Sequence, residues 1–183
     1  MLSRLNGIFA FAIYDAKSNE LFCARDPLGI KPFYYAEKND FFIFASELKA
    51  ILCAPQVSRE VDFTAIHNHL TFLWSPSPTT MLKSVHKLEP GFALLVKNGM
   101  IERHWRYWDI PYNQKDLISS EAECVKQVQD HLLEAVKRQL VADVPVGAFL
   151  SAGLDSATLT ALAAESSDTS LHTVTLGFNE YRD

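Results

Sequence analysis

Apolar runs and polar turns alternate along the first part of the chain. The runs are dense in β-branched and aromatic residues, a composition typical of strands. Three hairpins are therefore predicted, and the last is marked by Asn98-Gly99, a dipeptide favoured in tight two-residue turns. The predicted hairpins pair residues 7–14 with 20–25, 32–36 with 41–45, and 92–96 with 100–101.

Two helical segments interrupt this β-rich region. The first is a short helix over residues 46–52. Asp62 is predicted to cap a second helix over 63–72, because its carboxylate can accept hydrogen bonds from the free N–H groups of the first turn. The pattern as a whole favours an α+β architecture built on antiparallel strands.

The spacing of apolar residues along the chain changes after Trp108. Ser120-x-x-Glu123 is a capping box, and the apolar residues that follow recur at steps of three and four, which predicts an amphipathic helix to about Val141. Residues 144–150 are apolar without alternation and predict a buried parallel strand. The apolar stripe of the helix consists of Val125, Val128, Leu132, Val136 and Leu140.

A loop over 151–156, a helix over 157–165 and a strand over 171–178 complete the pattern. Their order is strand, loop, helix, strand, which is the unit of an open parallel sheet in α/β proteins. The polar segment 109–119 reads as a linker, so we expect one domain over 1–110 and another over 111–183.

Charge supports this division and excludes several functions. Residues 1–110 hold 12 basic and 11 acidic residues, whereas 111–183 hold 5 and 11. No basic stripe of the kind that binds nucleic acid is present, and no apolar run approaches the ~20 residues that cross a bilayer. No charged–apolar–small signal pattern opens the chain, so we expect a cytoplasmic protein. The three cysteines are odd in number and widely spaced, which predicts reduced, half-buried thiols.

The loop after the predicted buried strand carries the clearest chemistry. A strand-to-helix loop leaves backbone N–H groups free at the helix N-terminus, where the helix dipole favours an anion such as phosphate. Ser151 and Ser156 add hydroxyl donors, and Gly153 permits close approach of the backbone. Asp155 would repel phosphate, but fits a magnesium ion bound between the carboxylate and the phosphates. The alternative is structural: Ser151 and Asp155 cap a helix, and Gly153 supplies a turn.

The same loop, Ser151-Ala152-Gly153-Leu154-Asp155-Ser156, resembles the Ser-Gly-Gly-x-Asp-Ser pyrophosphate-binding loop of the ATP pyrophosphatase superfamily. The preceding residues 143–150 narrow the resemblance to glutamine-hydrolysing asparagine synthetases. Other segments resemble the second half of that family's glutaminase domain, so the resemblance covers nearly the whole chain. These segments are 5–15, 24–35, 45–50 and 87–92.

The resemblance implies both fold and function. Residues 1–110 would be part of an antiparallel, N-terminal-nucleophile type glutaminase domain, and 111–183 the start of a parallel-sheet ATP pyrophosphatase domain. The family's reaction uses ATP, Mg²⁺, aspartate and ammonia from glutamine, and makes asparagine through an aspartyl-adenylate. The expected macromolecular partner is a second copy of the full-length enzyme or a complementing chain.

The resemblance also implies the site residues. Asp155 would lie near Mg²⁺, and Leu150 and Leu176 would flank the adenine and ribose. Independently of the resemblance, Glu180 and Asp183 are further candidates, because they lie just past the carboxyl end of the second strand, where α/β proteins form their sites. The expected ATP- and pyrophosphate-binding residues are Leu150, Ser151, Ala152, Gly153, Leu154, Asp155, Ser156 and Leu176.

Two departures from the family pattern change the expectation. Ala152 stands where the loop usually has Gly. The family's nucleophile is an N-terminal Cys that uses its own amino group as base, but residue 2 is Leu and the three cysteines are internal. We therefore expect no catalytic residue in the glutaminase part, and a chain that is a fragment of the enzyme and inactive alone.

Three alternatives stay open. The scaffold could belong to a β-lactam-synthetase-like or peptide-cyclising relative, or to a non-catalytic remnant that binds a partner chain. Arg25 and Asp26 could line a domain interface or ammonia path, although a structural ion pair or hydrogen bonds within a turn beside Gly29 are the favoured interpretation.

Overall fold

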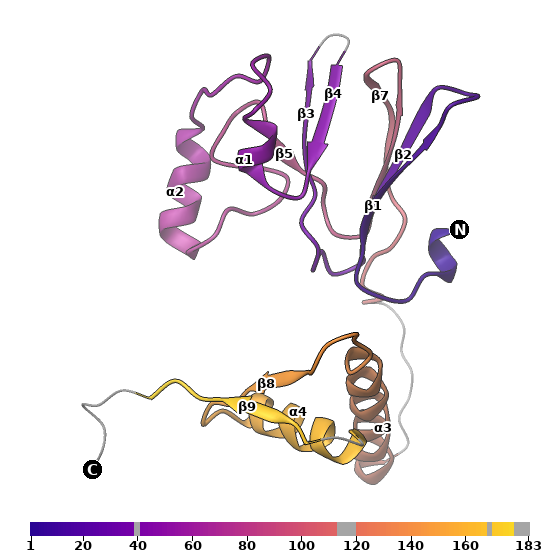
Figure 1. Cartoon of the computed structure of the whole chain (residues 1–183), viewed down its shortest axis with the longest axis vertical. Coiled ribbons are helices and arrows are strands. Elements are labelled where there is room, and N and C mark those ends of the chain that lie inside the picture. The colour runs from indigo at the N-terminus through magenta and orange to yellow at the C-terminus, as the bar shows by residue number, and fades with distance from the viewer. Residues whose placement is uncertain (39–40, 113–119, 168–169, 178–183) are drawn as a thin grey trace. The chain divides into compact units, whose positions relative to one another are not determined.

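The computed structural model describes residues 1–38, 41–112, 120–167 and 170–177. The chain divides into two units, Met1–Tyr112 and Asn113–Asp183, and each is considered by itself (Figure 1). Parts of the predicted linker, and Glu180 and Asp183, lie outside the described residues.

The first unit contains a four-stranded antiparallel sheet. Its strands are β1 (Ala10–Asp15), β2 (Glu20–Arg25), β6 (Phe92–Lys97) and β7 (Met100–Arg106), in the order β1-β2-β6-β7. The first and third predicted hairpins are therefore confirmed. Asn98 and Gly99 both have positive φ, at 51° and 77°, as the tight turn between β6 and β7 requires.

A second antiparallel sheet holds the remaining strands of this unit. Its order is β4-β3-β5, with β3 at Tyr34–Lys38, β4 at Phe41–Ala45 and β5 at His86–Lys87. Successive residues of β3 enter different cores because side chains alternate across a strand. Tyr35 packs with Cys23 and Leu94 of the first sheet, whereas Ala36 packs with Ile51. The second sheet thus lies between the first sheet and the segment that contains Ile51.

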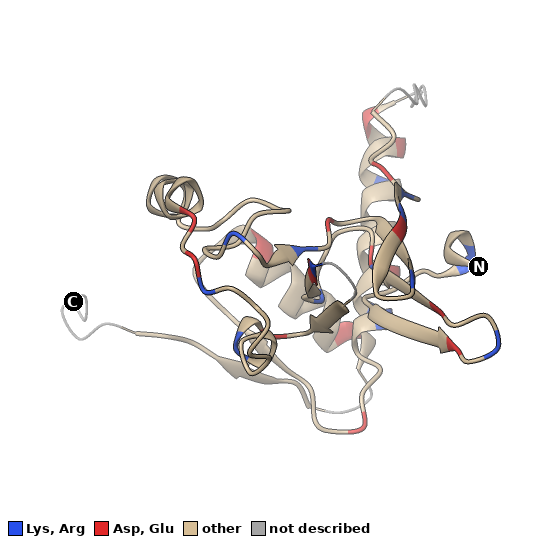
Figure 2. Cartoon of the chain, turned by 90° about the horizontal axis from the view of Figure 1, so that it is seen from above, with Lys and Arg blue, Asp and Glu red and all other residues tan. Residues whose placement is uncertain are grey.

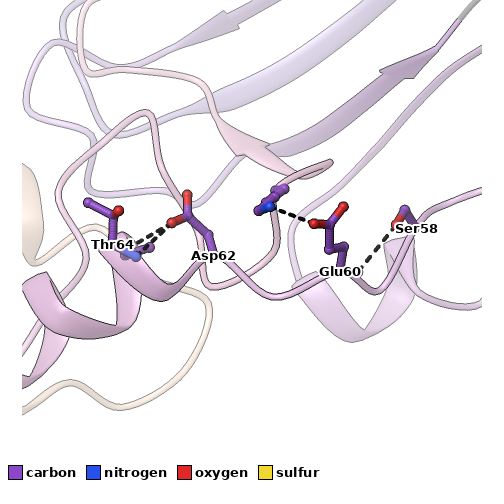
Figure 3. Close-up of polar contacts among 6 residues, drawn as sticks. Ser58, Glu60, Asp62 and Thr64 are labelled. Atoms are coloured by element: carbon purple, nitrogen blue, oxygen red, sulfur yellow. Dashed lines mark hydrogen bonds and ion pairs between the residues drawn. The ribbon is translucent and has the colours of Figure 1, made fainter.

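The helices of this unit are short. They are the 3₁₀ turn Leu2–Arg4, α1 (Leu48–Ile51) and α2 (Phe63–Phe72), so both predicted helices are confirmed. The Asp62 carboxylate accepts hydrogen bonds from the backbone N–H groups of Thr64 and Ala65, at 2.9 and 3.1 Å (Figure 3). The N-cap of α2 is therefore the one that the sequence predicts.

Arg25 and Asp26 hold the turn that follows β2. The Arg25 guanidinium donates to the carbonyl oxygens of Lys31, Leu88 and Gly29 at 2.6–2.7 Å. Asp26 is 1% exposed, and its carboxylate accepts from the N–H groups of Leu28, Ile30 and Lys31 at 3.0–3.2 Å. Burial lowers the pKa of Arg25, and the neighbouring Asp26 charge opposes that shift. These contacts match the turn interpretation.

The second unit has the predicted order of elements with different lengths. It consists of α3 (Glu121–Gln139), β8 (Gly147–Phe149), α4 (Leu154–Ser166) and β9 (His172–Val174), and β8 pairs in parallel with β9. The Ser120 hydroxyl accepts from the Glu123 N–H at 3.2 Å and caps α3. α4 begins at Leu154 rather than residue 157, so Asp155 and Ser156 lie in its first turn.

The expectation of a buried strand over 144–150 is wrong. Val144 and Phe149 are exposed, and the regular strand is only three residues long. A strand with one paired neighbour cannot be covered on both faces by the little structure around it, so alternate side chains remain in solvent. The apolar stripe of α3 is likewise only partly covered: Val136 is buried, but Val125 and Val128 are about half exposed.

The cysteines are free, as expected, but only one is deeply buried. Cys23 is buried, Cys124 is intermediate and Cys53 is exposed. Burial raises the pKa of the Cys23 thiol to about 12, so this thiol stays protonated and unreactive at neutral pH. Among the described residues, no helix has the length and apolar character needed to cross a membrane.

Candidate functional site

The loop that follows β8 lies at the carboxyl edge of the parallel strand pair. The N–H of Leu150 donates to the Val174 carbonyl at 2.9 Å, and the Thr175 hydroxyl donates to the Leu150 carbonyl at 2.8 Å. These two bonds hold the start of the loop against the end of β9. This edge is where open α/β sheets bind ligands, because loops and helix N-termini meet there.

Two serine hydroxyls organise the loop. The oxygen atoms of Ser151 and Ser156 lie 2.8 Å apart, and the Ser151 N–H donates to the Ser156 hydroxyl at 3.1 Å. The Gly153 N–H donates to the Ser151 hydroxyl at 3.2 Å, and the Ser156 hydroxyl lies 3.0 Å from the Gly153 carbonyl. The loop is thus closed by its own side chains, and both hydroxyls already have partners.

The N-terminus of α4 has no side-chain cap. Gly153 is the N-cap residue and has no side chain to cap the first turn, and among the described residues no side chain accepts a hydrogen bond from the N–H groups of Leu154, Asp155 or Ser156. The alternative in which Ser151 and Asp155 cap a helix is met only in part: the Ser151 hydroxyl accepts from the N–H of Gly153, the N-cap residue, whereas Asp155 lies in the first helical turn. The first N–H groups of a helix have no acceptor inside the helix. In α4 these are the N–H groups of Leu154, Asp155 and Ser156, and the loop that precedes them is exposed to solvent.

Gly153 acts through its small size. Its φ is −79°, which any residue adopts, so the position does not need a left-handed conformation. A Cβ at this position would lie 3.3 Å from the Ser151 hydroxyl oxygen, a close contact within the serine network. The predicted role in close approach therefore rests on space rather than on backbone freedom.

The three leucines of the predicted site do not line the cavity beside the loop, and two of them are exposed to solvent. Leu150 is half-buried, whereas Leu154 and Leu176 are exposed. A cavity of about 520 Å³ opens beside the loop between α3, β8 and α4; Asp155 and Ser156 line it, but none of these leucines does. Thr175 was missed by sequence reasoning, because a threonine at a strand end carries no signal until its partner, the Leu150 carbonyl, is known.

Two known protein families match the sequence of this chain. A family model described as glutamine amidotransferase domain matches residues 1–108, and one described as asparagine synthase matches 127–183. The chain belongs to the glutamine amidotransferase family over its first unit, and its second part matches the asparagine synthase family. The resemblance inferred from the motifs is thereby confirmed.

The similar proteins of this family are much longer than the chain. Asparagine synthetase [glutamine-hydrolyzing] 3 of Bacillus subtilis is 41% identical over 185 residues, which is 98% of this chain and 30% of that protein. Amidase chry2 of Gibberella zeae is 34% identical over 165 residues, with coverage of 89% and 24%. The chain thus spans about a third or less of the length of these relatives.

Among solved structures, a glutamine phosphoribosylpyrophosphate amidotransferase of B. subtilis aligns with 95% of this chain and 33% of its own, at 17% identity and a TM-score of 0.38. A likeness this weak carries no argument. The antiparallel sheets of the first unit and the parallel strand pair of the second follow from the strand pairing of this chain alone.

Proposed function

We propose that the chain is part of a glutamine-hydrolysing asparagine synthetase of the cytoplasm. Residues 1–110 would belong to the glutaminase domain and 111–183 to the ATP-using synthetase domain. The family membership supports the division, since the two family models match on either side of the proposed boundary. The substrates proposed for the whole enzyme are ATP, aspartate and glutamine.

One observation carries the assignment of the ATP site. The uncapped N-terminus of α4 leaves backbone N–H groups at an exposed loop, with two serine hydroxyls and one carboxylate beside them. Phosphate is the ligand that this set of donors suits best. The loop serines would exchange their bonds to each other for bonds to phosphate oxygens when the nucleotide binds.

Magnesium fits the same loop through Asp155. Among the described residues, no group of three or more His, Cys, Asp and Glu is placed to hold a metal ion. Mg²⁺ commonly takes one or two carboxylates, with phosphate oxygens and water completing its shell, so a single exposed Asp155 is sufficient. Bound there, the ion would neutralise phosphate charge and favour departure of pyrophosphate.

The reaction proposed for the whole enzyme activates a carboxylate. A side-chain oxygen of aspartate attacks the α-phosphorus of ATP, the bond to pyrophosphate breaks, and an aspartyl-adenylate forms. Ammonia then attacks the acyl carbon, AMP leaves, and the nitrogen loses a proton. The part we assign to this chain is to bind and orient the pyrophosphate end of ATP through Ser151, Gly153, Asp155 and Ser156.

We assign no glutaminase nucleophile within this chain. Cys23 is buried with a raised thiol pKa, and none of the three cysteines is at an N-terminus, so none carries an α-amino group to act as base. We therefore propose that residues 1–110 have the fold of a glutaminase domain, and we assign them no role in hydrolysing glutamine.

Binding of ATP with Mg²⁺ to the purified chain, measured by calorimetry, tests the site. We expect Asp155→Asn to weaken binding by about tenfold or more, because a ligand of the metal ion is lost. Ser156→Ala should also weaken binding, because the hydroxyl both organises the loop and contacts phosphate.

Glu165→Gln is the matched control, since Glu165 is an exposed carboxylate near the opposite end of the same helix. It should bind ATP as the unsubstituted chain does. If the unsubstituted chain shows no binding, or if Glu165→Gln weakens binding as much as Asp155→Asn does, the assignment of this loop is wrong.

A second candidate keeps the ATP site and changes the acceptor. The similarity to amidase chry2 shows that this sequence pattern extends to a protein named for another amide chemistry. An ATP–pyrophosphate exchange assay on the whole enzyme separates the two candidates. Exchange that depends on aspartate supports asparagine synthesis, whereas exchange with a different carboxylic acid and none with aspartate supports the second candidate.

A further inference from the structure

The peptide unit between Leu150 and Ser151 is held at both ends by side-chain hydroxyls. Its carbonyl oxygen, on Leu150, accepts a hydrogen bond from the Thr175 hydroxyl at 2.8 Å. Its N–H, on Ser151, donates to the Ser156 hydroxyl at 3.1 Å. The two hydroxyls come from different elements, because Ser156 lies in the first turn of α4 and Thr175 follows β9. Since a peptide unit is planar, a contact that fixes the carbonyl also fixes the direction of the N–H.

Thr175 acts where the ladder between β8 and β9 would otherwise continue. Main-chain hydrogen bonds are evenly spaced in a parallel pair. The Leu150 N–H donates to the Val174 carbonyl at 2.9 Å, so the next bond of a regular ladder would join the Leu176 N–H to the Leu150 carbonyl. The regular strands end at Phe149 and Val174, and the Thr175 hydroxyl is the donor to that carbonyl. A side chain therefore ends the ladder at the point where the serine loop begins.

Nucleotide binding would affect the two hydroxyls differently. In the proposed function, Ser156 exchanges its bonds within the loop for bonds to phosphate oxygens, and this exchange releases the Ser151 N–H as a further donor. The bond from Thr175 to the Leu150 carbonyl involves none of the loop's donors, so it persists when phosphate binds. Of the two hydroxyls, Thr175 is then the one that still holds the peptide unit.

The direction of each donor matters here because the loop offers phosphate no cationic side chain. Residues 144–156 and 170–177 contain no Lys or Arg, and Asp155 is their only charged residue. The ribbon of β9 and the chain that follows it towards the C-terminus are accordingly tan in Figure 2. A hydrogen bond weakens steeply as its angle departs from linear, so neutral N–H groups bind phosphate well only when they point at its oxygen atoms.

We propose that Thr175 is a positioning residue of the nucleotide site. Its hydroxyl holds the Leu150 carbonyl so that the Ser151 N–H points at the phosphate groups of ATP after Ser156 has released it. Thr175 itself does not contact the phosphates. This role rests on the function proposed above, and it adds to that function a residue that acts through the main chain of the loop.

Binding of ATP and of inorganic pyrophosphate to the purified chain, each with Mg²⁺ and measured by calorimetry, tests the proposal. Thr175→Val keeps the branched shape of the side chain and removes the hydroxyl. It should raise both dissociation constants by about fivefold, the effect expected for loss of one neutral hydrogen bond. Thr175→Ser keeps a hydroxyl donor and should restore binding to within about twofold of the unsubstituted chain. Thr175→Ala, a second variant without the hydroxyl, should weaken binding at least as much as Thr175→Val.

Thr173→Val is the matched control. Thr173 lies on β9, two positions before Thr175, and is exposed; its hydroxyl makes no hydrogen bond within the part of the chain that the structure describes. The control should leave both dissociation constants unchanged, and circular dichroism should show that every variant retains the fold.

The Ser151 amide reports its own orientation in ¹H–¹⁵N NMR spectra. At saturating pyrophosphate with Mg²⁺, its signal should shift strongly in the unsubstituted chain and in Thr175→Ser, and much less in Thr175→Val. A residue that merely stabilises the strand pair would not change this shift once the ligand is bound.

Several outcomes would overturn the role of Thr175 while leaving the proposed function intact. They are unchanged binding by Thr175→Val, a loss that Thr175→Ser does not restore, and an equal loss in Thr173→Val. Weaker binding of ATP with unchanged binding of pyrophosphate would also overturn it, because the effect would then lie at the nucleoside. If the unsubstituted chain binds neither ligand, the proposed function itself fails, and the role of Thr175 fails with it.

Discussion

Asp26 shows how one side chain can fix a turn. Its carboxylate satisfies three backbone N–H groups, and its own carbonyl oxygen accepts from the N–H groups of Gly29 and Gly91. The neighbouring Arg25 satisfies three carbonyl oxygens from the other side. Gly29 is left-handed at φ 66°, and a Cβ there would lie 2.8 Å from Pro90, so this turn tolerates little change.

Replacing Asp26 with Ala should therefore destabilise the first unit by about 2 kcal/mol, because three part-buried N–H groups lose their acceptor and Arg25 loses a nearby opposite charge. Urea unfolding followed by tryptophan fluorescence measures the loss. Asp109→Ala is the control, since that carboxylate pairs with Arg106 at the surface and its loss should cost less than about 1 kcal/mol. Equal effects of the two substitutions would contradict this account of the turn.

Two helix N-termini of the chain differ in a way that matters for function. Asp62 caps α2 and accepts two hydrogen bonds from its first turn. In the part of the chain that the structure describes, no side chain caps the first turn of α4, where the N–H groups face the exposed serine loop. A structural helix end is satisfied by its own sequence, whereas an end that binds phosphate must leave its donors free for the ligand.

Removing the cap of α2 should destabilise the first unit. We expect Asp62→Ala to lower the free energy of unfolding by about 1 kcal/mol, and Asp62→Asn to restore most of it, because an amide oxygen can accept the same bonds. Thermal unfolding of the three proteins under identical conditions checks this. An Asn variant as unstable as the Ala variant would show that the carboxylate acts by its charge and not as an acceptor.

The buried core is distributed unevenly over the whole molecule. Of the buried hydrophobic residues in the described part of the chain, thirteen lie in Met1–Tyr112 and only Val136 and Ala163 lie in Asn113–Asp183. Buried apolar area is the main source of stability, so the second unit has much less to hold it together.

Hydrogen exchange measured by mass spectrometry should reveal this difference. We expect the amides of β2 and β6 to exchange slowest, because they lie at the centre of a four-stranded sheet over the larger core. The amides of α3 and α4 should exchange faster, through openings of lower free energy. Adding ATP with Mg²⁺ should slow exchange at the start of α4 and leave β2 unchanged, if the loop binds the nucleotide. Equal protection of both units would contradict the interpretation of the core.

Local signals predicted much of this structure. The hairpins, the Asp62 cap, the Ser120 cap and the parallel order of the second unit all follow from patterns within a few residues of each other, and the structure contains them. The residues of the serine loop were likewise identified from their spacing. Periodicity, turn residues and caps succeed because the interactions behind them are between near neighbours in the chain.

The sequence by itself determined the elements, the family and the candidate loop. Only the tertiary structure decided what those elements bury. It placed Asp155 in the first turn of α4, joined Thr175 to the Leu150 carbonyl, and left Phe149 in solvent. The reason is physical: burial and hydrogen-bond partners depend on segments far apart in the chain, and a pattern read along one segment does not say whether another segment covers it.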